Sequence, residues 1–437
     1  MDQTQNLENL WMPFSANRAF KSKPRLMNEA KGMYYKKLGG ESVLDATSGL
    51  WCCNAGHNHP KIVEAIRQQA GKLDYAPSFQ MGHPLGFKAA EELLKFSPSP
   101  DFKYTFFTNS GSESVDTALK IALGYHQLRG KKEKTILVGR ERAYHGVGFG
   151  GISVGGLPLN KKHFSLLENV DHISSTHNID KNAFSKGLPD WGADLANDLL
   201  RIIKKHGADK IAAFITEPLA GSTGVLVPPK GYLEKIRKIC TDHDILLIFD
   251  EVITGFGRLG TPFASQYFNV IPDMIVCAKG LTSGTVPMGA VLLKKKIYDS
   301  FQNANSKTIE LFHGYTYSAH PLAAAALMAT LEVYNEEGLF DRANELAPYW
   351  EDALHSLKGT DYVIDIRNLG LVGGIEMSPK NDQVGLRGYD VFENGFHEEN
   401  ILLRFTGDII ALSPPLIIEK EHIDKIVSIL INIIPKN

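Results

Sequence analysis

The segments ILLIFDEVITGFGRLG (245–260) and PDMIVCAKG (272–280) each contain a short apolar run that ends in a charged residue. Asp250 ends the first run and Lys279 follows the second. Runs this short, apolar and rich in β-branched residues are typical of strands buried on both faces of a parallel sheet. We therefore predict an open α/β sheet, and such sheets bind ligands at the carboxyl ends of their strands.

The same alternation of apolar runs and helical patterns extends through the middle of the chain. The predicted strands cover 103–108, 134–139, 211–216, 245–250, 273–278 and 289–294, and the predicted helices include 112–128, 193–206 and 230–243. In the last of these helices, Leu233, Ile236 and Cys240 fall on one face. This order predicts a mostly parallel central sheet with helices on both sides.

From about residue 321 the pattern changes. Two long helical stretches come first, then strand-like pieces and a final amphipathic helix; they cover 321–334, 340–357, 363–377, 401–412 and the region of Ile423 to Leu430. We predict a large domain over 60–320 and a smaller α+β domain built from 1–59 and 321–437. The N-terminal segments GMYYKK and ESVLDA are expected to pair with the C-terminal part.

Composition excludes several classes of protein. The 437 residues are 43% hydrophobic and 22% charged with a net charge of −2, which is ordinary for a soluble globular chain. There is no basic patch for a nucleic acid or an anionic membrane and no apolar run of about 18 residues. The first residues lack the basic and apolar regions typical of a signal peptide, so we expect none. The four cysteines form no CxxC pair, so we expect neither a disulfide framework nor a metal site, and a cytoplasmic location.

Two short motif matches are rejected. Residues 255–260 match GxGxxG, but Glu251 to Thr254 separate them from the strand, and the proline-flanked segment after them makes a poor dinucleotide-binding helix. Residues 151–155 match the GxSxG elbow of hydrolases, which needs a helix directly after the serine. The sequence GGLP follows Val154 instead, so we interpret this region as a glycine-rich loop.

The positions of Asp250 and Lys279 indicate a specific chemistry. One acid at a strand end is most often a salt-bridge partner or a helix cap. A lysine at the end of a buried strand is unusual, because burying an unpaired ammonium is costly. An electron-sink cofactor needs both groups: the lysine forms a Schiff base, and the acid keeps a pyridine nitrogen protonated.

Such a cofactor also needs a phosphate cradle. The segment TNSGSES (108–114) follows a predicted strand and opens a predicted helix. Small residues let the backbone approach an anion, and a helix N-terminus offers free N–H groups. Taken alone, the segment is explained equally well as an ordinary serine N-cap of the helix. The presence of Asp250 and Lys279 favours the interpretation as a phosphate-binding segment.

The stretch LLIFDEVITGFGRLG…PDMIVCAKGLTSGTVPMGAV resembles the signature of class III aminotransferases, fold type I enzymes that use pyridoxal 5′-phosphate. The resemblance covers essentially the whole chain. Within the class it is most similar to β-alanine (omega-amino acid):pyruvate aminotransferases. The segments that show this similarity are WMPFSANRAFK, SGLWCCNAGH, LDYAPSFQMGHPL, EPLAGSTGVLVPPKGYL, FHGYTYSAHP and VIDIRNLGLVGGIE.

The resemblance implies a role for each matching residue. Lys279 would bind the cofactor covalently and move the proton. The other implied cofactor contacts are Asp250 at the pyridinium, Val252 and Tyr144 on the two ring faces, Gly111 and Ser112 at the phosphate, and Glu217 in the surrounding polar network. Thr316 would reach the phosphate of a neighbouring subunit, which implies a homodimer with active sites at the interface. Whether dimers pair into tetramers stays open.

The implied substrate contacts are fewer. Trp51 and Phe79 resemble aromatic pocket walls, and Phe14 is a third candidate, although core packing explains these residues as well. Arg404, in LLRFTGD, matches a mobile arginine that binds a carboxylate through a two-pronged pair. A surface arginine is the plain alternative.

The implied reaction moves an amino group from an omega-amino acid or amine to pyruvate, which gives an aldehyde or ketone and alanine. Taurine:pyruvate, 4-aminobutyrate, diaminopelargonate and ornithine aminotransferases share the machinery, as do an aminomutase and a decarboxylase. Two alternatives come from other classes: a serine hydrolase acting through Ser153, and a cofactor-free binding protein.

Overall fold

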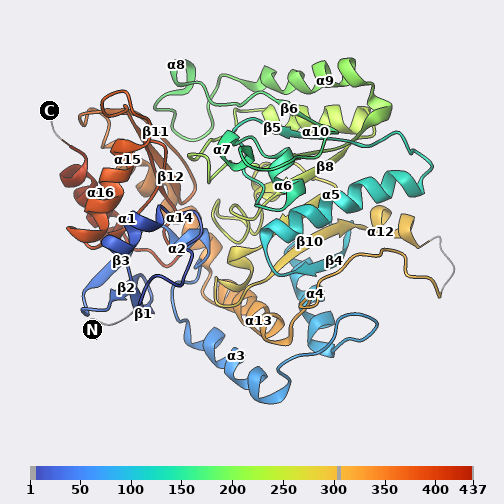
Figure 1. The fold of residues 1–437 in the computed structure, drawn as a ribbon, viewed down its shortest axis with the longest axis horizontal. Coiled ribbons are helices and arrows are strands. Elements are labelled where there is room, and N and C mark those ends of the chain that lie inside the picture. Colours follow the sequence, from blue (N-terminus) through green and yellow to red (C-terminus); the bar gives the residue numbers. More distant parts are fainter. Residues whose placement is uncertain (1–5, 303–306, 436–437) are drawn as a thin grey trace.

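The computed structural model describes residues 6–302 and 307–435. The two ends of the chain lie side by side: the N-terminal strands and the C-terminal helices form one part, and residues from about 100 to 300 form the other (Figure 1). No helix among the described residues is both long and apolar enough to span a membrane.

A seven-stranded sheet forms the centre of the larger part, in the order β4-β10-β9-β8-β7-β5-β6. Its strands are β4 (Phe102–Thr108), β5 (Ile136–Arg140), β6 (Val170–Ile173), β7 (Ile211–Thr216), β8 (Leu246–Asp250), β9 (Met274–Cys277) and β10 (Gly289–Lys294). The strands from β6 to β9 run parallel, and β10 runs antiparallel to both of its neighbours. The prediction of a mostly parallel α/β sheet is therefore confirmed.

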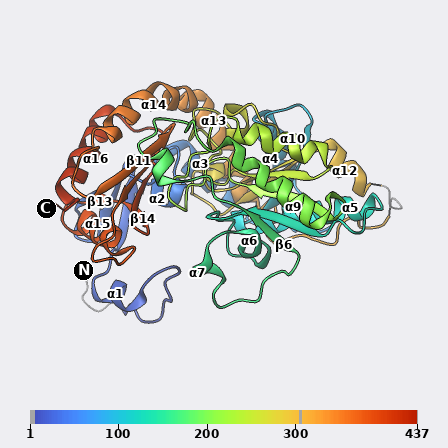
Figure 2. The ribbon, with the colours of Figure 1, turned by 90° about the horizontal axis from the view of Figure 1, so that it is seen from above.

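Helices cover both faces of this sheet (Figure 2). Helix α5 (Gly111–Leu128) packs on one face, and α9 (Asp198–His206) and α10 (Tyr232–Asp242) pack on the other. Within β8, Ile248 belongs to the core beneath α5, whereas Leu247 and Phe249 belong to the opposite core. Burial on both faces explains why these strands are apolar throughout. Residues 193–197, which the sequence predicts to be α-helical, form a separate 3₁₀ turn before α9.

Two smaller sheets join the chain ends. One has the order β1-β2-β3-β13, with β1 (Met27–Lys31), β2 (Tyr34–Lys37), β3 (Ser42–Asp45) and β13 (Ile401–Leu402); the other has the order β11-β12-β15-β14, with β11 (Val363–Leu369), β12 (Val372–Met377), β14 (Arg404–Thr406) and β15 (Ile409–Leu412). Leu44 pairs with Ile401, so the predicted pairing with the C-terminal part is confirmed for the ESVLDA segment. The GMYYKK segment pairs with β1 and β3 and joins the C-terminal strand only through β3. The domain boundaries themselves stay a prediction.

The remaining helices surround these sheets. They are α3 (Pro60–Lys72), α4 (Pro84–Lys95), α6 (Phe149–Val154), α13 (Pro321–Glu336), α14 (Leu339–His355), α15 (Leu386–His397) and α16 (Lys420–Ile433), together with the short helices α1 (Asn17–Ser22), α2 (Ser48–Trp51), α7 (Pro158–Lys161), α8 (Ile179–Asn182), α11 (Ala264–Tyr267) and α12 (Lys295–Phe301). Helix α13 packs on α3 and α4 as well as on α14, so it links the two parts.

Candidate active site

A cavity of about 120 Å³ opens where the parallel strands of the large sheet end. It brings together seven of the residues that the sequence marks as cofactor contacts: Gly111, Ser112, Tyr144, Glu217, Asp250, Val252 and Lys279. They lie at the carboxyl ends of β4, β5, β7, β8 and β9 or in the segments that follow these strands, including the first turn of α5. Convergence of residues so far apart in the chain at one sheet edge is typical of ligand sites in α/β proteins.

Lys279 lies just beyond β9, on a residue with left-handed backbone geometry (φ 53°). Burial lowers the pKa of its amine, because a low-dielectric surrounding disfavours the ammonium form, while the negative charges of Asp250 and Glu217 oppose the change. A lysine with a lowered pKa is a better nucleophile and base near neutral pH.

Asp250 ends the adjacent strand β8 and is 5% exposed. Its Oδ2 lies 2.8 Å from Nδ1 of His145, and its Oδ1 accepts a hydrogen bond of 3.1 Å from the Val252 N–H. His145 was not predicted as a site residue, although it directly follows Tyr144 in the RAYHG motif. His145 is buried, and its Nε2 has no hydrogen-bond partner among the described residues. The imidazole therefore fixes the orientation of the carboxylate.

The start of α5 can hold an anion. Ser110 caps the helix by accepting the Glu113 N–H, and Glu113 accepts the Asn109 N–H, so the expected N-cap is also present. These contacts leave the N–H groups of Gly111 and Ser112 at the open helix end. A Cβ on Gly111 would lie 2.9 Å from Val252, so glycine is needed to keep the cradle open.

Glu217 follows β7 and is almost fully buried. Its Oε2 accepts a hydrogen bond of 3.1 Å from the Tyr144 N–H. Burial raises the pKa of this carboxyl to about 7, although the neighbouring His145 opposes the rise. Glu217 thus connects the loop that carries Tyr144 to the end of β7.

Five predicted residues are not among those that line the cavity: Thr316, Phe79, Phe14, Trp51 and Arg404. Thr316, Phe79 and Phe14 are exposed, a Cβ on Gly314 would lie 2.8 Å from the Phe79 ring, and the carbonyl of Thr316 accepts a hydrogen bond from Tyr75. Trp51 is buried in a hydrophobic cluster that also contains Ile253, a cavity residue that the sequence reasoning missed. Of these five residues, Trp51 and Arg404 lie near the site in a single chain.

Arg404 begins β14 and approaches the site from the C-terminal part of the chain. It lies within electrostatic reach of Tyr144 and Lys279, and burial lowers the pKa of its guanidinium. In the described part of the chain no carboxylate forms an ion pair with it, and its Nε has no hydrogen-bond partner. An unpaired, largely buried guanidinium is suited to binding an anionic ligand.

The two rejected motifs do not form the sites that their patterns imply. Residues 255–260 form turns, and the helix after them, α11, is only four residues long. Ser153 lies within helix α6, so the interpretation of residues 151–155 as a loop was wrong for 151–154: the GGLP sequence ends this helix rather than preventing it. The Ser153 hydroxyl is buried, donates to the Phe149 carbonyl and accepts the Leu167 N–H, and so is already occupied.

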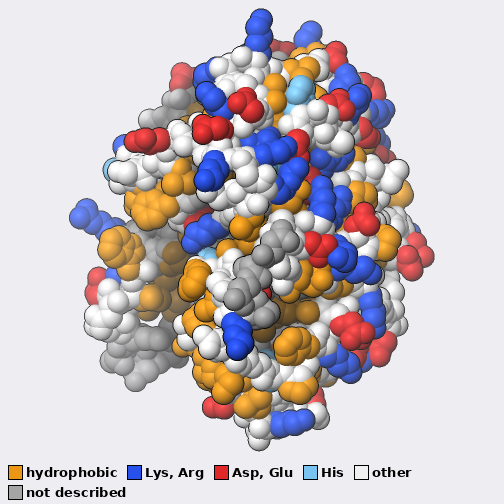
Figure 3. Space-filling view, turned by 90° about the vertical axis from the view of Figure 1, so that its right-hand side faces the viewer, with side chains coloured by type: hydrophobic (Ala, Val, Ile, Leu, Met, Phe, Trp, Pro, Cys, Tyr) orange, Lys and Arg blue, Asp and Glu red, His pale blue; other side chains and the backbone are white. Residues whose placement is uncertain are grey.

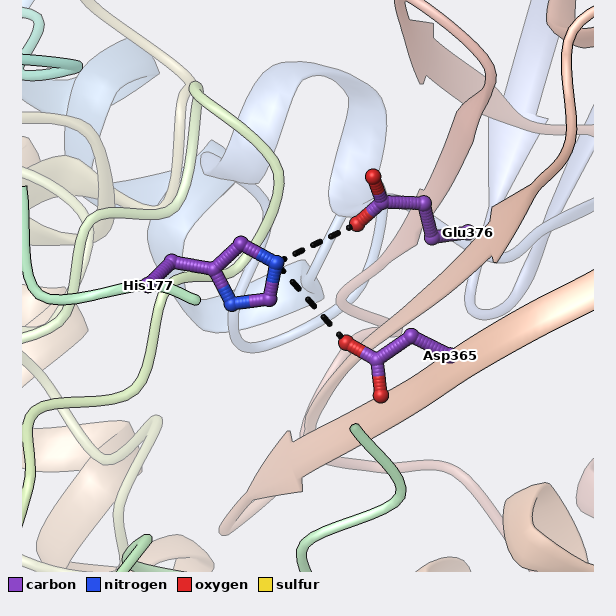
Figure 4. A group of neighbouring side chains, drawn as sticks. All are labelled: His177, Asp365 and Glu376. Atoms are coloured by element: carbon purple, nitrogen blue, oxygen red, sulfur yellow. Dashed lines mark ion pairs between the residues drawn. The ribbon is translucent and has the colours of Figure 1, made fainter. Parts of the chain in front are cut away.

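A second cluster of titratable groups lies outside the cavity. His177 Nε2 lies 3.6 Å from Glu376 and 4.0 Å from Asp365, which project from β12 and β11 (Figure 4). Both carboxylates also contact Arg367, at 2.7 Å from Glu376. The guanidinium balances one of these two negative charges, and the contacts of His177 tie the loop after β6 to the C-terminal sheet.

Comparison with known proteins gives one consistent result. Residues 15–434 match the family model described as aminotransferase class-III. The chain is 60% identical over 423 residues to an omega-aminotransferase of Caulobacter vibrioides, covering 97% of this chain and 96% of that protein. It is 46% identical to a beta-alanine–pyruvate aminotransferase of Pseudomonas aeruginosa, covering 96% and 94%. The omega transaminase of Pseudomonas jessenii, solved in complex with PMP, superposes with a TM-score of 0.92 at 31% identity, covering 98% and 97%.

Proposed function

Because the chain belongs to the class III aminotransferases, we propose that it transfers the amino group of an omega-amino acid or a related amine to pyruvate. The products are an aldehyde or ketone and alanine. Relatives at 60%, 46% and 44% identity carry the names omega-aminotransferase, beta-alanine–pyruvate and omega-amino acid–pyruvate aminotransferase, which supports this substrate class.

Class III aminotransferases use pyridoxal 5′-phosphate, and the cavity fits this group. The open end of α5 suits a phosphate, the buried Asp250 suits a protonated ring nitrogen, and Lys279 stands at the neighbouring strand end. When bound, the cofactor draws electrons away from the substrate carbon that bears nitrogen.

The residues of the chain supply the remaining chemistry. Lys279 Nζ would take the proton from the amine-bearing carbon of the donor and deliver it to the cofactor, and it would move a proton in the opposite direction when the keto acid is aminated. Its lowered pKa leaves the amine unprotonated often enough to act as a base. Asp250, held by His145, keeps a proton on the ring nitrogen. Val252 and Tyr144 are the side chains proposed to enclose the ring from its two faces, and Ser112 is proposed to bind the phosphate.

The assignment of the substrates rests on the unpaired guanidinium of Arg404. Pyruvate and β-alanine both present a carboxylate, which a guanidinium binds through two parallel charge-assisted hydrogen bonds. With no acid competing for it in the described structure, Arg404 is available to each substrate in turn. We assign it the recognition of the substrate carboxylate.

We also propose a homodimer in which Thr316 and Phe79 serve the site of the partner subunit. Both are exposed in the single chain, and other large hydrophobic side chains near them in sequence are exposed as well: Met81, Phe87, Phe312 and Tyr317. Hydrophobic side chains gather in the lower part of the face shown in Figure 3. Apolar surface of this kind is typical of a protein interface. Trp51 and Phe14 remain candidates for the substrate pocket.

A screen of amine donors and keto acid acceptors tests the function. The proposal predicts that β-alanine with pyruvate gives alanine, measured by chromatography, and that 2-oxoglutarate is a poor acceptor. Activity with 2-oxoglutarate and none with pyruvate would instead favour a 4-aminobutyrate or ornithine aminotransferase.

A further inference from the structure

The ends of four neighbouring parallel strands carry charged residues in a regular spatial order. Strands β9, β8, β7 and β5 lie side by side, and Lys279, Asp250, Glu217 and Arg140 stand at or just beyond their carboxyl ends. The first three face the cavity, and the proposed reaction uses Lys279 and Asp250 directly. Arg140 has no role in that account.

Arg140 is an unusual buried cation. It is 1% exposed, and its Nε, Nη1 and Nη2 atoms make no hydrogen bond of normal geometry within residues 6–302 and 307–435. The hydroxyl of Tyr232 lies next to it and is likewise without a well-formed bond. A guanidinium stays protonated in proteins, so its charge must be balanced by a nearby acid or by bound water.

The strand register and the electrostatics of Glu217 place this acid near Arg140. Val138 of β5 pairs with Phe214 of β7, so Arg140 lies level with Thr216, and Glu217 is the next residue. Glu217 is almost fully buried and uses one carboxylate oxygen to accept the Tyr144 N–H. The charged and titratable groups around it are His145, Asp250, Arg140 and Lys279. Burial favours the neutral carboxyl, whereas His145 and Arg140 favour the carboxylate.

We propose that Arg140 is a positioning residue whose buried charge favours the ionisation of Glu217 at neutral pH and above, so that the Glu217 carboxylate holds the Tyr144–His145 segment in place beside Asp250. An ionised acceptor binds a backbone N–H more strongly than a neutral carboxyl does. Because His145 Nδ1 lies 2.8 Å from Asp250, movement of this segment alters the acid that faces the cofactor. The catalytic consequence rests on the proposed function, but the charge coupling between Arg140 and Glu217 does not.

Infrared spectroscopy of the holoenzyme tests the coupling directly, since only a protonated carboxyl shows the acid C=O stretching band. The band of Glu217 is identified by comparison: it is the pH-dependent C=O band that is present in the wild type and absent from Glu217→Gln. In the wild type it should disappear around pH 7. In Arg140→Met it should persist to a pH higher by about one unit or more, and in Arg140→Lys, which keeps the cation, it should stay within about half a unit of the wild type.

The pH dependence of activity provides a second test of the proposal. The acid limb of the pH profile for alanine formation should move upward in Arg140→Met and remain in place in Arg140→Lys. An unchanged Glu217 titration in a folded Arg140→Met protein would overturn the proposal. If Arg140→Met does not fold, the infrared titration of the wild-type protein still tests the proposal. A Glu217 band that persists above about pH 9 in the wild type contradicts an ionising role for Arg140. Failure of the donor and acceptor screen would leave the infrared result intact, so the two failures are distinguishable.

Discussion

At the scale of single residues, burial decides the chemistry of Lys279. Removal of solvent disfavours its ammonium form more strongly than Asp250 and Glu217 favour it, so the pKa of the amine falls. Arg404, by contrast, keeps its charge although burial lowers its pKa, because a guanidinium titrates far above neutral pH. The site therefore combines one amine that can lose its proton with one cation that cannot.

Replacing Arg404 should separate the two kinds of substrate. Arg404→Ala should lower kcat/KM for pyruvate by roughly ten- to a hundredfold, because a charge-assisted contact worth about 1.5–3 kcal/mol is lost. The half-reaction with an amine that has no carboxylate should change less than about threefold on the same reasoning. Arg404→Lys should fall between these values for pyruvate. Equal losses with both substrates, measured by single-turnover kinetics, would contradict carboxylate binding by Arg404.

At the scale of elements, the anion cradle depends on how the loop after β5 approaches the start of α5. Gly146 has a φ of +87°, and a Cβ there would lie 2.4 Å from Ser112 Oγ. Ser112 Oγ also accepts the Val147 N–H at 3.1 Å. A side chain at residue 146 would push these two segments apart.

Gly146→Ala should therefore weaken cofactor binding at least tenfold, a cost of about 1.4 kcal/mol. Gly130→Ala is the matched control: its φ is +76°, but its Cβ would meet nothing within 4 Å. Both variants should lose similar stability from the left-handed backbone, and only Gly146→Ala should lose affinity for pyridoxal phosphate in a titration followed by absorbance. Equal affinities in the two variants would show that the close approach is unimportant.

Much of this element structure follows from the sequence, because strands buried on both faces have a clear apolar pattern. The predicted strand 289–294 is observed with the same bounds, and the predicted 273–278 is observed as β9, Met274–Cys277. The stretch 363–377 proved to be two strands, with a turn at Gly370 where φ is +55°. The sequence also revealed Asp250 and Lys279, but not His145 or the unpaired state of Arg140, since partners from separate loops are fixed only by the fold.

At the scale of the whole molecule, buried acids make stability depend on pH. Burial raises the pKa of both Glu217 and Glu251 to about 7, from 4.5 in the unfolded chain. Between these values the folded state holds protons that the unfolded chain has released, so stability is greatest below about pH 4.5 for these two groups and is lost as the pH rises through 7.

We expect the urea concentration at half-unfolding to fall from pH 5 to pH 8 on account of these groups. Glu217→Gln should make the dependence shallower, because the amide oxygen can still accept the Tyr144 N–H but the group no longer titrates. The difference in slope between wild type and variant isolates Glu217 from all other titrating groups. An identical slope in both proteins would mean that Glu217 is ionised in the folded state throughout this range.

The proposed dimer makes each active site depend on two chains. Thr316→Ala should weaken binding of pyridoxal phosphate by up to about tenfold, because one hydrogen bond to the phosphate is lost. Mixing subunits that carry Lys279→Ala with subunits that carry Thr316→Ala should restore one complete site per mixed dimer. Absence of any tight site in the purified mixed dimer, measured by cofactor titration, would place Thr316 outside the partner's site.

The covalent attachment of the cofactor to Lys279 is the central claim, and borohydride reduction followed by peptide mass mapping tests it most directly. Reduction of the holoenzyme should fix a pyridoxyl phosphate group on the peptide that contains Lys279. The Lys279→Ala protein should bind the cofactor without becoming labelled and should lose alanine formation. A label on another lysine, or activity close to that of the wild type in Lys279→Ala, would contradict the account.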